Sequence, residues 1–306
     1  EDFTMAITAQ MVKELRETTG AGMMDCKKAL TEADGNMEKA IDLLREKGLS
    51  KAAKKADRIA AEGLVNIEMN AEGNAASIVE VNSETDFVAK NQDFKDFVKD
   101  VAQMVLEGDY ADVPALLAAN HKEGKALQDV LNDRIATIGE KIDVRRFAKL
   151  SVDGKVVGYI HGGGKIGVLV QLETSANDEK VVALGRDIAM QVAAMNPKYI
   201  SRDDVDKDYI AHETEVLTQQ ALNEGKPANI VEKMVVGRLN KELKEVCLLD
   251  QVFVKDSELT ISKLVAKVAK EVGADIKVAG MLRYEVGEGI EKKEENFAEE
   301  VAKQMK

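Results

Sequence analysis

The stretch that decides the fold is LVNIEMNAEGNAASIVEV, residues 64–81, in which apolar side chains recur at intervals of two on both sides of a turn. At that period, side chains alternate between the two faces of a β-strand. Glu72-Gly73-Asn74 supplies the turn, so the stretch predicts a β-hairpin. The chain then changes to helical spacing. The apolar residues of this predicted helix are Phe94, Phe97, Val98, Val101, Ala102 and Val105.

The same order of elements recurs further along the chain. A second hairpin is expected from near Phe147, with turns at 153–154 and 162–164, and a helix that carries Leu184, Ile188, Ala189, Val192 and Ala193. Without gaps, Ile78 aligns with Leu169 at an offset of 91 residues (169 − 78). The same offset pairs Phe97 with Ile188, Val101 with Val192 and Ala102 with Ala193. We therefore predict an α+β protein with a duplicated core, its subdomains at 63–146 and 147–286.

Residues 5–48 are predicted to form a module of three short helices, because start and stop signals alternate there at short spacing. Thr8, Asp25 and Asn36 are the expected caps of the three helices. The first helix should end at 19–22 and the second at 34–35, where glycines lie. We interpret residues 1–4 as an added leader ahead of Met5.

Three further segments complete the predicted organisation. Residues 49–62 are expected to be a helical linker. Residues 201–245 predict an antiparallel helical hairpin that buries little by itself, so we expect it to pack against another protein or a second copy, as a possible homodimer. Residues 287–306 predict a C-terminal helical module.

The linker carries four cations, which either lie on a solvated face or contact nucleic acid: Lys51, Lys54, Lys55 and Arg58. We favour the solvated face because the aromatic side chains that stack on bases are absent from it. The formal net charge of −12 also opposes attraction to nucleic acid or anionic lipid as the main activity.

Composition excludes several other classes. No apolar run is long enough for a membrane span, and no secretion signal is visible, so we expect a cytoplasmic protein. Cys26 and Cys247 lack metal-ligand spacing, as do the three histidines, so neither a metal nor a cofactor is expected. The motifs of hydrolases, kinases and P-loop enzymes are absent, which argues against an enzyme.

Thr85-Asp86-Phe87-Val88 is the first candidate site, because two apolar residues lie where a strand gives way to a helix and a polar loop is usual. One interpretation is that Phe87 packs into the local core and Asp86 caps the helix. The other is an aromatic wedge beside a carboxylate, presented to a partner. The aligned loop of the second repeat, residues 175–178, lacks the apolar pair, which favours a specialised role for the first.

Two more sites have two interpretations each. His161, beside the glycine turn at 162–164, is either an exposed contact or a hydrogen-bonded structural histidine. The turn is not a phosphate-binding P-loop, because Ile166 stands where that motif has Ser or Thr and a strand follows in place of a helix. Met23 and Met24 either form an adaptable contact for another protein or divide into one buried and one exposed residue.

Three blocks of this sequence resemble the signatures of the elongation factor Ts family: LRETTGAGMMDCKKAL at 15–30, EVNSETDFVA at 80–89 and RYEVGEGIEK at 283–292. The segment HGGGKIGVLV, residues 161–170, is similar to the family's histidine-bearing turn. The blocks occur in the family's order from Met5 onward. Ser83, Glu84 and a longer segment at 113–126 depart from the pattern.

The resemblance implies a guanine nucleotide exchange factor that binds the GDP-bound or nucleotide-free GTPase elongation factor Tu and does not itself bind nucleotide. It implies that the N-terminal module has a ubiquitin-associated-like fold and docks on the GTPase domain, with Leu15, Met23 and Met24 as contacts. Thr85, Asp86, Phe87 and Val88 would then disturb the partner's magnesium site. His161 would enter an apolar pocket of the partner, and Phe297 and Val301 of the C-terminal helix would hold the same domain.

Rival functions rest on fewer residues. A structural or ubiquitin-like-binding protein would use the N-terminal module and the charged hairpin. A nucleic-acid chaperone would rest on the cations at 51–58 alone, and an enzyme lacks a candidate group of acid and base residues.

Overall fold

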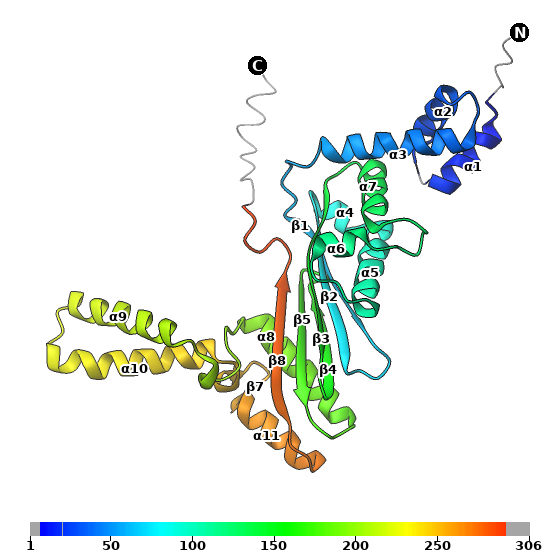
Figure 1. Ribbon diagram of the computed structural model, residues 1–306. Helices are drawn as coiled ribbons and strands as arrows, with labels where there is room; N and C mark the ends of the chain where they lie inside the picture. The colour runs from blue at the N-terminus through cyan, green and yellow to red at the C-terminus, as the bar shows by residue number, and fades with distance from the viewer. Residues whose placement is uncertain (1–6, 20, 292–306) are drawn as a thin grey trace, which may run out of the picture.

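The computed structural model describes residues 7–19 and 21–291 (Figure 1). The helices of this part are α1 (Ala9–Thr19), α2 (Met23–Glu32), α3 (Met37–Ala53), α4 (Asp86–Lys90), α5 (Gln92–Glu107), α6 (Val113–Ala118), α7 (Leu127–Ile138), α8 (Glu179–Met195), α9 (Lys207–Asn223), α10 (Ala228–Val246) and α11 (Ile261–Val272). The strands are β1 (Glu62–Met69), β2 (Ala75–Ser83), β3 (Ile142–Ser151), β4 (Gly154–His161), β5 (Ile166–Glu173), β6 (Val252–Phe253), β7 (Asp256–Thr260) and β8 (Lys277–Glu285). The mixed α+β class is as predicted.

Two three-stranded antiparallel sheets form the centre of the molecule, in the orders β1-β2-β3 and β4-β5-β8. They pack face to face through buried apolar side chains, among them Val65, Ile78, Leu169 and Tyr284. The sheets approach closely at Gly167, where a Cβ atom would lie only 2.4 Å from Cγ1 of Val65. Helices cover both outer faces, so the core has four layers (Figure 1).

The alternation of β2 and β5 explains the layers. Val79 and Val81 of β2 face α5 and α7, where they join a cluster that includes Phe94 and Phe97. Ile78, between them in sequence, faces the other sheet. In β5, Val168, Val170 and Leu172 face α8 and α11, and Leu169 faces the first sheet.

The offset of 91 residues also relates backbone details of the two sheets. Gly63 and Gly154 both have positive φ, 134° and 149°. A Cβ atom at either would clash with a carbonyl oxygen, that of Val81 at 2.2 Å and that of Leu172 at 2.1 Å. The ladders are irregular between Glu80 and Val81 and between residues 171 and 172. Bulges and glycines with positive φ thus recur at the spacing of the sequence repeat.

The strand expected near Phe147 does not open the second sheet, and this prediction was wrong. That strand is β3, which pairs with β2 along the edge opposite β1. Its buried residues Ile142 and Val144 pack in the first helical cluster, which explains the pairing. The turn at 153–154 therefore connects the two sheets. The turn at 162–164 joins β4 to β5 as predicted.

The three N-terminal helices bury a small core that includes Val12, Leu15, Cys26 and Leu30. Oγ1 of Thr8 and Oδ1 of Asn36 accept backbone hydrogen bonds at the starts of α1 and α3, as predicted. Asp25 is not a cap, which corrects our expectation. The helix begins three residues earlier (25 − 22), because Gly22 takes the extended N-cap conformation, and Asp25 instead binds Lys51.

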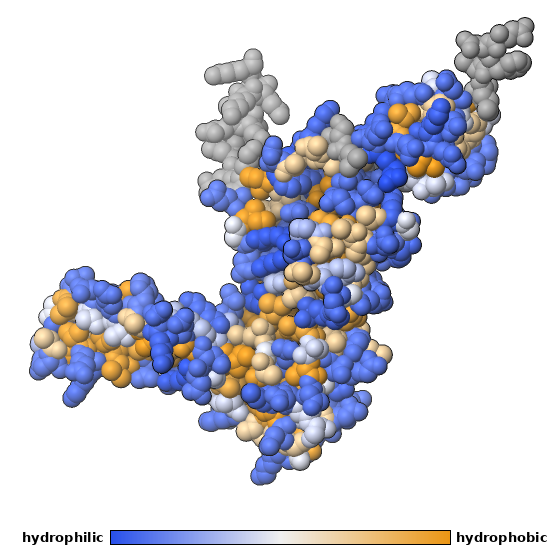
Figure 2. Space-filling model, in the orientation of Figure 1, coloured by the Kyte–Doolittle hydropathy of each residue, from blue (hydrophilic) through white to orange (hydrophobic). Residues whose placement is uncertain are grey.

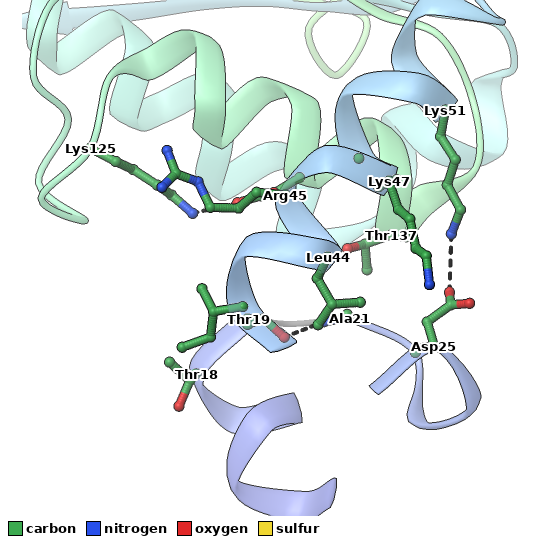
Figure 3. A pocket seen from close by; sticks show the side chains of 15 residues that line it. Thr18, Thr19, Ala21, Asp25, Leu44, Arg45, Lys47, Lys51, Lys125 and Thr137 are labelled. Carbon is green, nitrogen blue, oxygen red and sulfur yellow. Dashed lines mark hydrogen bonds and ion pairs between the residues drawn. The ribbon is translucent and has the colours of Figure 1, made fainter. Parts of the chain in front are cut away.

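Helix α3 continues without a break to Ala53, past the expected end of the module at residue 48. It packs along α7, so the module rests against the first subdomain. A cavity of about 190 Å³ lies in this seam, and Figure 3 shows Lys51 and Asp25 paired at its edge. Lys125 and Arg45, also at the cavity, are paired with Asp133 and Asp129.

Helices α9 and α10 form the predicted antiparallel hairpin, which projects sideways from the second subdomain (Figure 1). Ala221, Val231 and Val235 fill the seam between the helices. The segment 113–138 looks helical in sequence, and the structure divides it into α6 and α7 with a loop at 119–126 between them. Phe297 and Val301 lie outside the described residues.

None of the described helices has the length and apolar character that crossing a bilayer requires.

Candidate functional site

Phe87 lies in the first turn of α4, where 79% of its surface is exposed. This exposure shows that the interpretation of Phe87 as a core residue is wrong. Asp86 is not the cap of the helix either. The cap is Thr85, whose Oγ1 accepts from the backbone N–H of Val88 at 3.5 Å. Val88 itself is buried and anchors the short helix. Of the four residues, the loop presents Phe87 outward and Val88 inward.

Asp86 and Lys90 form an ion pair of 2.6 Å on one side of Phe87, and the Lys90 amine lies 5.8 Å from the centre of the ring. The hydrogen bond from Lys90 lowers the pKa of Asp86, and the charge of Lys165 acts in the same direction. The exposed aromatic ring is therefore bordered by a carboxylate that is ionised at neutral pH.

His161 is exposed at the end of β4, and its Nδ1 lies 2.9 Å from the hydroxyl of Tyr159. The glycine turn that follows has positive φ at all three glycines, 60°, 66° and 101°, which other residues rarely adopt. Gly164 is buried against β1, and its carbonyl accepts from the N–H of Val65 at 2.8 Å. The structure shows one feature of each interpretation of His161: the side chain is exposed, and it has a hydrogen-bond partner.

The His161 turn and the Phe87 loop lie at the same end of the core. Val65, which holds the turn, is near the start of β1, and the start of β1 pairs with the end of β2, which leads into Thr85. Lys165 at the end of the turn is paired with Glu62, the first residue of β1. Two candidate contacts separated by 74 residues (161 − 87) are thus brought to one edge of the fold.

Met23 and Met24 are 60% and 66% exposed at the start of α2. The interpretation that one of them is buried is therefore wrong. Leu15 has no exposed surface and lies in the three-helix core, so it has no surface available to a partner, which corrects its assignment as a contact. Its spacing on α1 fits a core position as well as a contact, which is why the sequence did not distinguish the two.

The sequence also missed residues that hold the Phe87 loop. Both the N–H and the hydroxyl of Thr85 donate to the carboxylate of Glu140, at 3.0 and 2.7 Å. Fifty-five residues separate the two, and no pattern in the sequence joins them. Among residues 7–19 and 21–291, no three His, Cys, Asp or Glu side chains gather in a way that would hold a metal ion.

The fold and these exposed sites define a class: an α+β protein that presents apolar side chains on ordered turns for docking to another protein. A family model described as Elongation factor TS matches residues 84–288. The chain is 74% identical over 300 residues to Elongation factor Ts of Clostridioides difficile, covering 98% of this chain and 99% of the relative. The proteins of that name from Clostridium acetobutylicum and Clostridium perfringens are 55% and 54% identical, over 98% and 97% of this chain and 98% of each relative.

The chain belongs to the elongation factor Ts family. Membership implies a nucleotide exchange factor for elongation factor Tu in translation elongation, a role without covalent catalysis.

Proposed function

We propose that this chain binds elongation factor Tu in its GDP-bound and nucleotide-free forms, disturbs the magnesium and phosphate site, and so promotes GDP release in the cytoplasm. The observation that carries the proposal is Phe87, a large apolar side chain that is 79% exposed between Thr85, which is hydrogen-bonded to Glu140, and the buried Val88. Exposing an aromatic ring to water is unfavourable, so a fixed and exposed ring is accounted for by a partner that covers it.

The proposed mechanism needs no nucleotide site on this chain. Magnesium bridges the phosphates of a bound nucleotide to the GTPase, so a wedge that displaces its ligands weakens retention of GDP. Phe87 would supply the wedge, and Asp86 a negative charge beside it that competes with carboxylates and phosphates for cations. His161, at the same edge of the core, would contact the partner near its phosphate-binding loop.

Other parts of the chain would add contact area. We propose that the N-terminal module, of ubiquitin-associated-like fold, docks on the GTPase domain through Met23 and Met24, whose flexible side chains adapt to an apolar surface. Phe297 and Val301 would contact the same domain. We also propose that the core arose by duplication, which the recurrence of bulges and glycines at one offset supports.

The hairpin has apolar side chains that are exposed among the residues that the structure describes. Leu222, Ile230 and Val236 are 45%, 45% and 55% exposed, and Figure 2 shows apolar surface along α9 and α10. We propose that a second copy covers this face in a homodimer. Sedimentation velocity should then show a dimer that Val236→Lys dissociates, and a monomer at high concentration of the unchanged chain would refute the pairing.

Release of a fluorescent GDP analogue from purified elongation factor Tu tests the main proposal. With magnesium present and this chain at one-tenth the concentration of the GTPase, we expect release of all bound GDP at an accelerated rate, because each molecule acts repeatedly. Spontaneous release rates, measured with a folded sample and a partner from the same species, would refute the exchange function.

A further inference from the structure

The Phe87 loop is held by a segment that is distant in sequence, the turn between α7 and β3. The carboxylate of Glu140 on this turn accepts from the N–H of Thr85 at 3.0 Å and from its hydroxyl at 2.7 Å. Hydrogen bonds to an ionised acceptor are stronger than neutral ones. Thr85 is in turn the cap of α4, so Glu140 fixes the residue from which the helix that bears Phe87 begins.

The contact is reciprocal. Glu84, beside Thr85, accepts from the backbone N–H of Lys141, beside Glu140, at 2.6 Å. Each of two neighbouring segments thus gives a carboxylate to the backbone of the other. Two such bonds between the same segments restrict both translation and rotation of the loop, which a single bond would not.

The same network of hydrogen bonds reaches the linker, residues 49–62, which joins the N-terminal module to the core. The amine of Lys141 donates to the carbonyls of Ala56 and Arg58, at 2.7 and 3.0 Å. Arg58 donates to Glu84 at 3.3 Å. Hydrogen bonds therefore join the linker, the Phe87 loop and the α7–β3 turn into one unit. We call the side chains that make these bonds the carboxylate clamp: Arg58, Glu84, Thr85, Glu140 and Lys141.

We propose that Glu140 is a positioning residue for nucleotide exchange, acting through the carboxylate clamp to present Phe87 in one fixed orientation. The proposal rests on the exchange function and on the wedge role of Phe87. A wedge that is ordered before binding loses less conformational entropy on docking, so more of the contact energy is available to distort the partner. Glu140 itself need not contact the partner.

A double-mutant cycle between Glu140 and Phe87 tests this role. In Glu140→Ala, both bonds to Thr85 are lost, and we expect the GDP release rate at saturating factor to fall about tenfold. The affinity for nucleotide-free elongation factor Tu should fall less. In Glu140→Gln, one acceptor oxygen remains, so the GDP release rate should lie between the rates with the unchanged chain and with Glu140→Ala. Glu107→Ala is the matched control, because Glu107 is an exposed carboxylate of the same subdomain whose side chain bonds within its own helix.

The decisive comparison is in the Phe87→Ala background. If Glu140 acts by positioning the ring, Glu140→Ala should cost nothing further there. An equal tenfold loss in both backgrounds would overturn the proposal, because Glu140 would then act independently of the wedge.

A readout on the free chain separates this proposal from the exchange function. Amide hydrogen exchange of residues 84–90 should quicken about tenfold in Glu140→Ala and remain unchanged in Glu107→Ala. Unchanged amide exchange would overturn the clamp even if GDP release responds. Faster amide exchange in a chain that never accelerates GDP release would instead refute the proposed function and leave the clamp as a fact of the fold.

Discussion

Phe87 has a role that can be tested at the scale of one residue, because its ring contributes little to folding. We expect Phe87→Ala to slow catalysed GDP release at least tenfold while the free energy of unfolding changes by less than about 0.5 kcal/mol, as for other exposed positions. Stopped-flow release rates and urea unfolding measure the two quantities. Met69→Ala is a matched control, since Met69 is 41% exposed at the end of β1 that lies away from the Phe87 loop. An unchanged rate of GDP release with a folded Phe87→Ala protein would refute the wedge role of Phe87.

His161 should matter less than Phe87. Its ring is exposed, and its hydrogen bond to Tyr159 joins two residues of one strand, so we expect His161→Ala to reduce release by a smaller factor with little change in thermal stability. A fall in the melting temperature as large as the fall in rate would identify a structural histidine instead.

The environment of Glu80 predicts how the stability of the fold depends on pH. Its side chain is buried between the sheets and accepts from Arg145, Arg146, Asn82 and the N–H of Gly287, at 3.0, 2.5, 3.1 and 2.8 Å. Burial by itself would raise the pKa of Glu80, but the hydrogen bonds outweigh it and lower the pKa below the ordinary 4.5. The stability that Glu80 contributes is therefore present above pH 4.5 and is lost as the pH falls through the lower, folded-state pKa.

We expect Glu80→Gln to lose about 3 kcal/mol of unfolding free energy at pH 7, because two arginines keep their charges beside a neutral group. The difference from the unchanged chain should shrink at pH 3.5, because below pH 4.5 the unfolded chain binds a proton at Glu80 more readily than the folded chain does. Urea unfolding at the two pH values measures it. A difference that is the same at both would mean that the charge of Glu80 contributes nothing.

Residues differ in how far the sequence alone defines them. Phe94 and Phe97 were identified as core because helical spacing puts them on one face, and both are buried. Leu15 has the same kind of spacing, but the family resemblance assigned it to a contact surface instead. The spacing of apolar residues gave no sign of Glu80 or Glu140, because a carboxylate in a strand or a turn is ordinarily solvated. Apart from Asn82 beside Glu80, their partners lie 55 or more residues away.

At the scale of elements, the close approach of the two sheets depends on glycine. A methyl group at Gly167 would lie 2.4 Å from Val65 and 3.2 Å from Ile78, so Gly167→Ala should destabilise the fold by about 1 to 3 kcal/mol. Gly237 in α10 is the matched control, because no atom lies within 4 Å of its added Cβ. Gly237→Ala should stabilise the chain by about 0.5 to 1 kcal/mol through helix propensity. Denaturant unfolding of both variants checks the pair, and equal effects would argue against tight sheet packing.

The element boundaries show what periodicity leaves open. Alternation identified β1, β2, β4 and β5, and the helical spacing of apolar residues identified α5 and α8. It did not say which sheet β3 joins, since pairing depends on contacts along the other edge of β2. The loop between α6 and α7 was missed because its residues 119–126 include alanines and a leucine-rich flank that resemble helix.

In the whole molecule, the exposed contacts are distributed over three parts of the fold. The three-helix module and the hairpin of α9 and α10 lie far apart in Figure 1, and α4, which bears Phe87, belongs to the core between them. The order of these parts followed from the sequence, but their relative positions did not. The seam between α3 and α7 and the carboxylate clamp, which set those positions, join residues that are distant in the chain.

An exchange factor of this kind must obey reciprocity. If the bound chain lowers the affinity of elongation factor Tu for GDP by some ratio, GDP must lower the affinity of elongation factor Tu for the chain by the same ratio. Under the proposed function, incoming nucleotide would therefore expel the chain, and one molecule would act repeatedly without covalent chemistry.

The four equilibria of this cycle are measurable by calorimetry: GDP binding with and without the chain, and chain binding with and without GDP. We expect the two ratios to agree, and both to shrink when magnesium is removed, because the wedge then has no metal to displace. Phe87→Ala should reduce the same ratio, since it removes the contact that opposes magnesium. If GDP bound equally well with and without the chain while its release was faster, the chain would lower a barrier only, and displacement of magnesium would not be its mechanism.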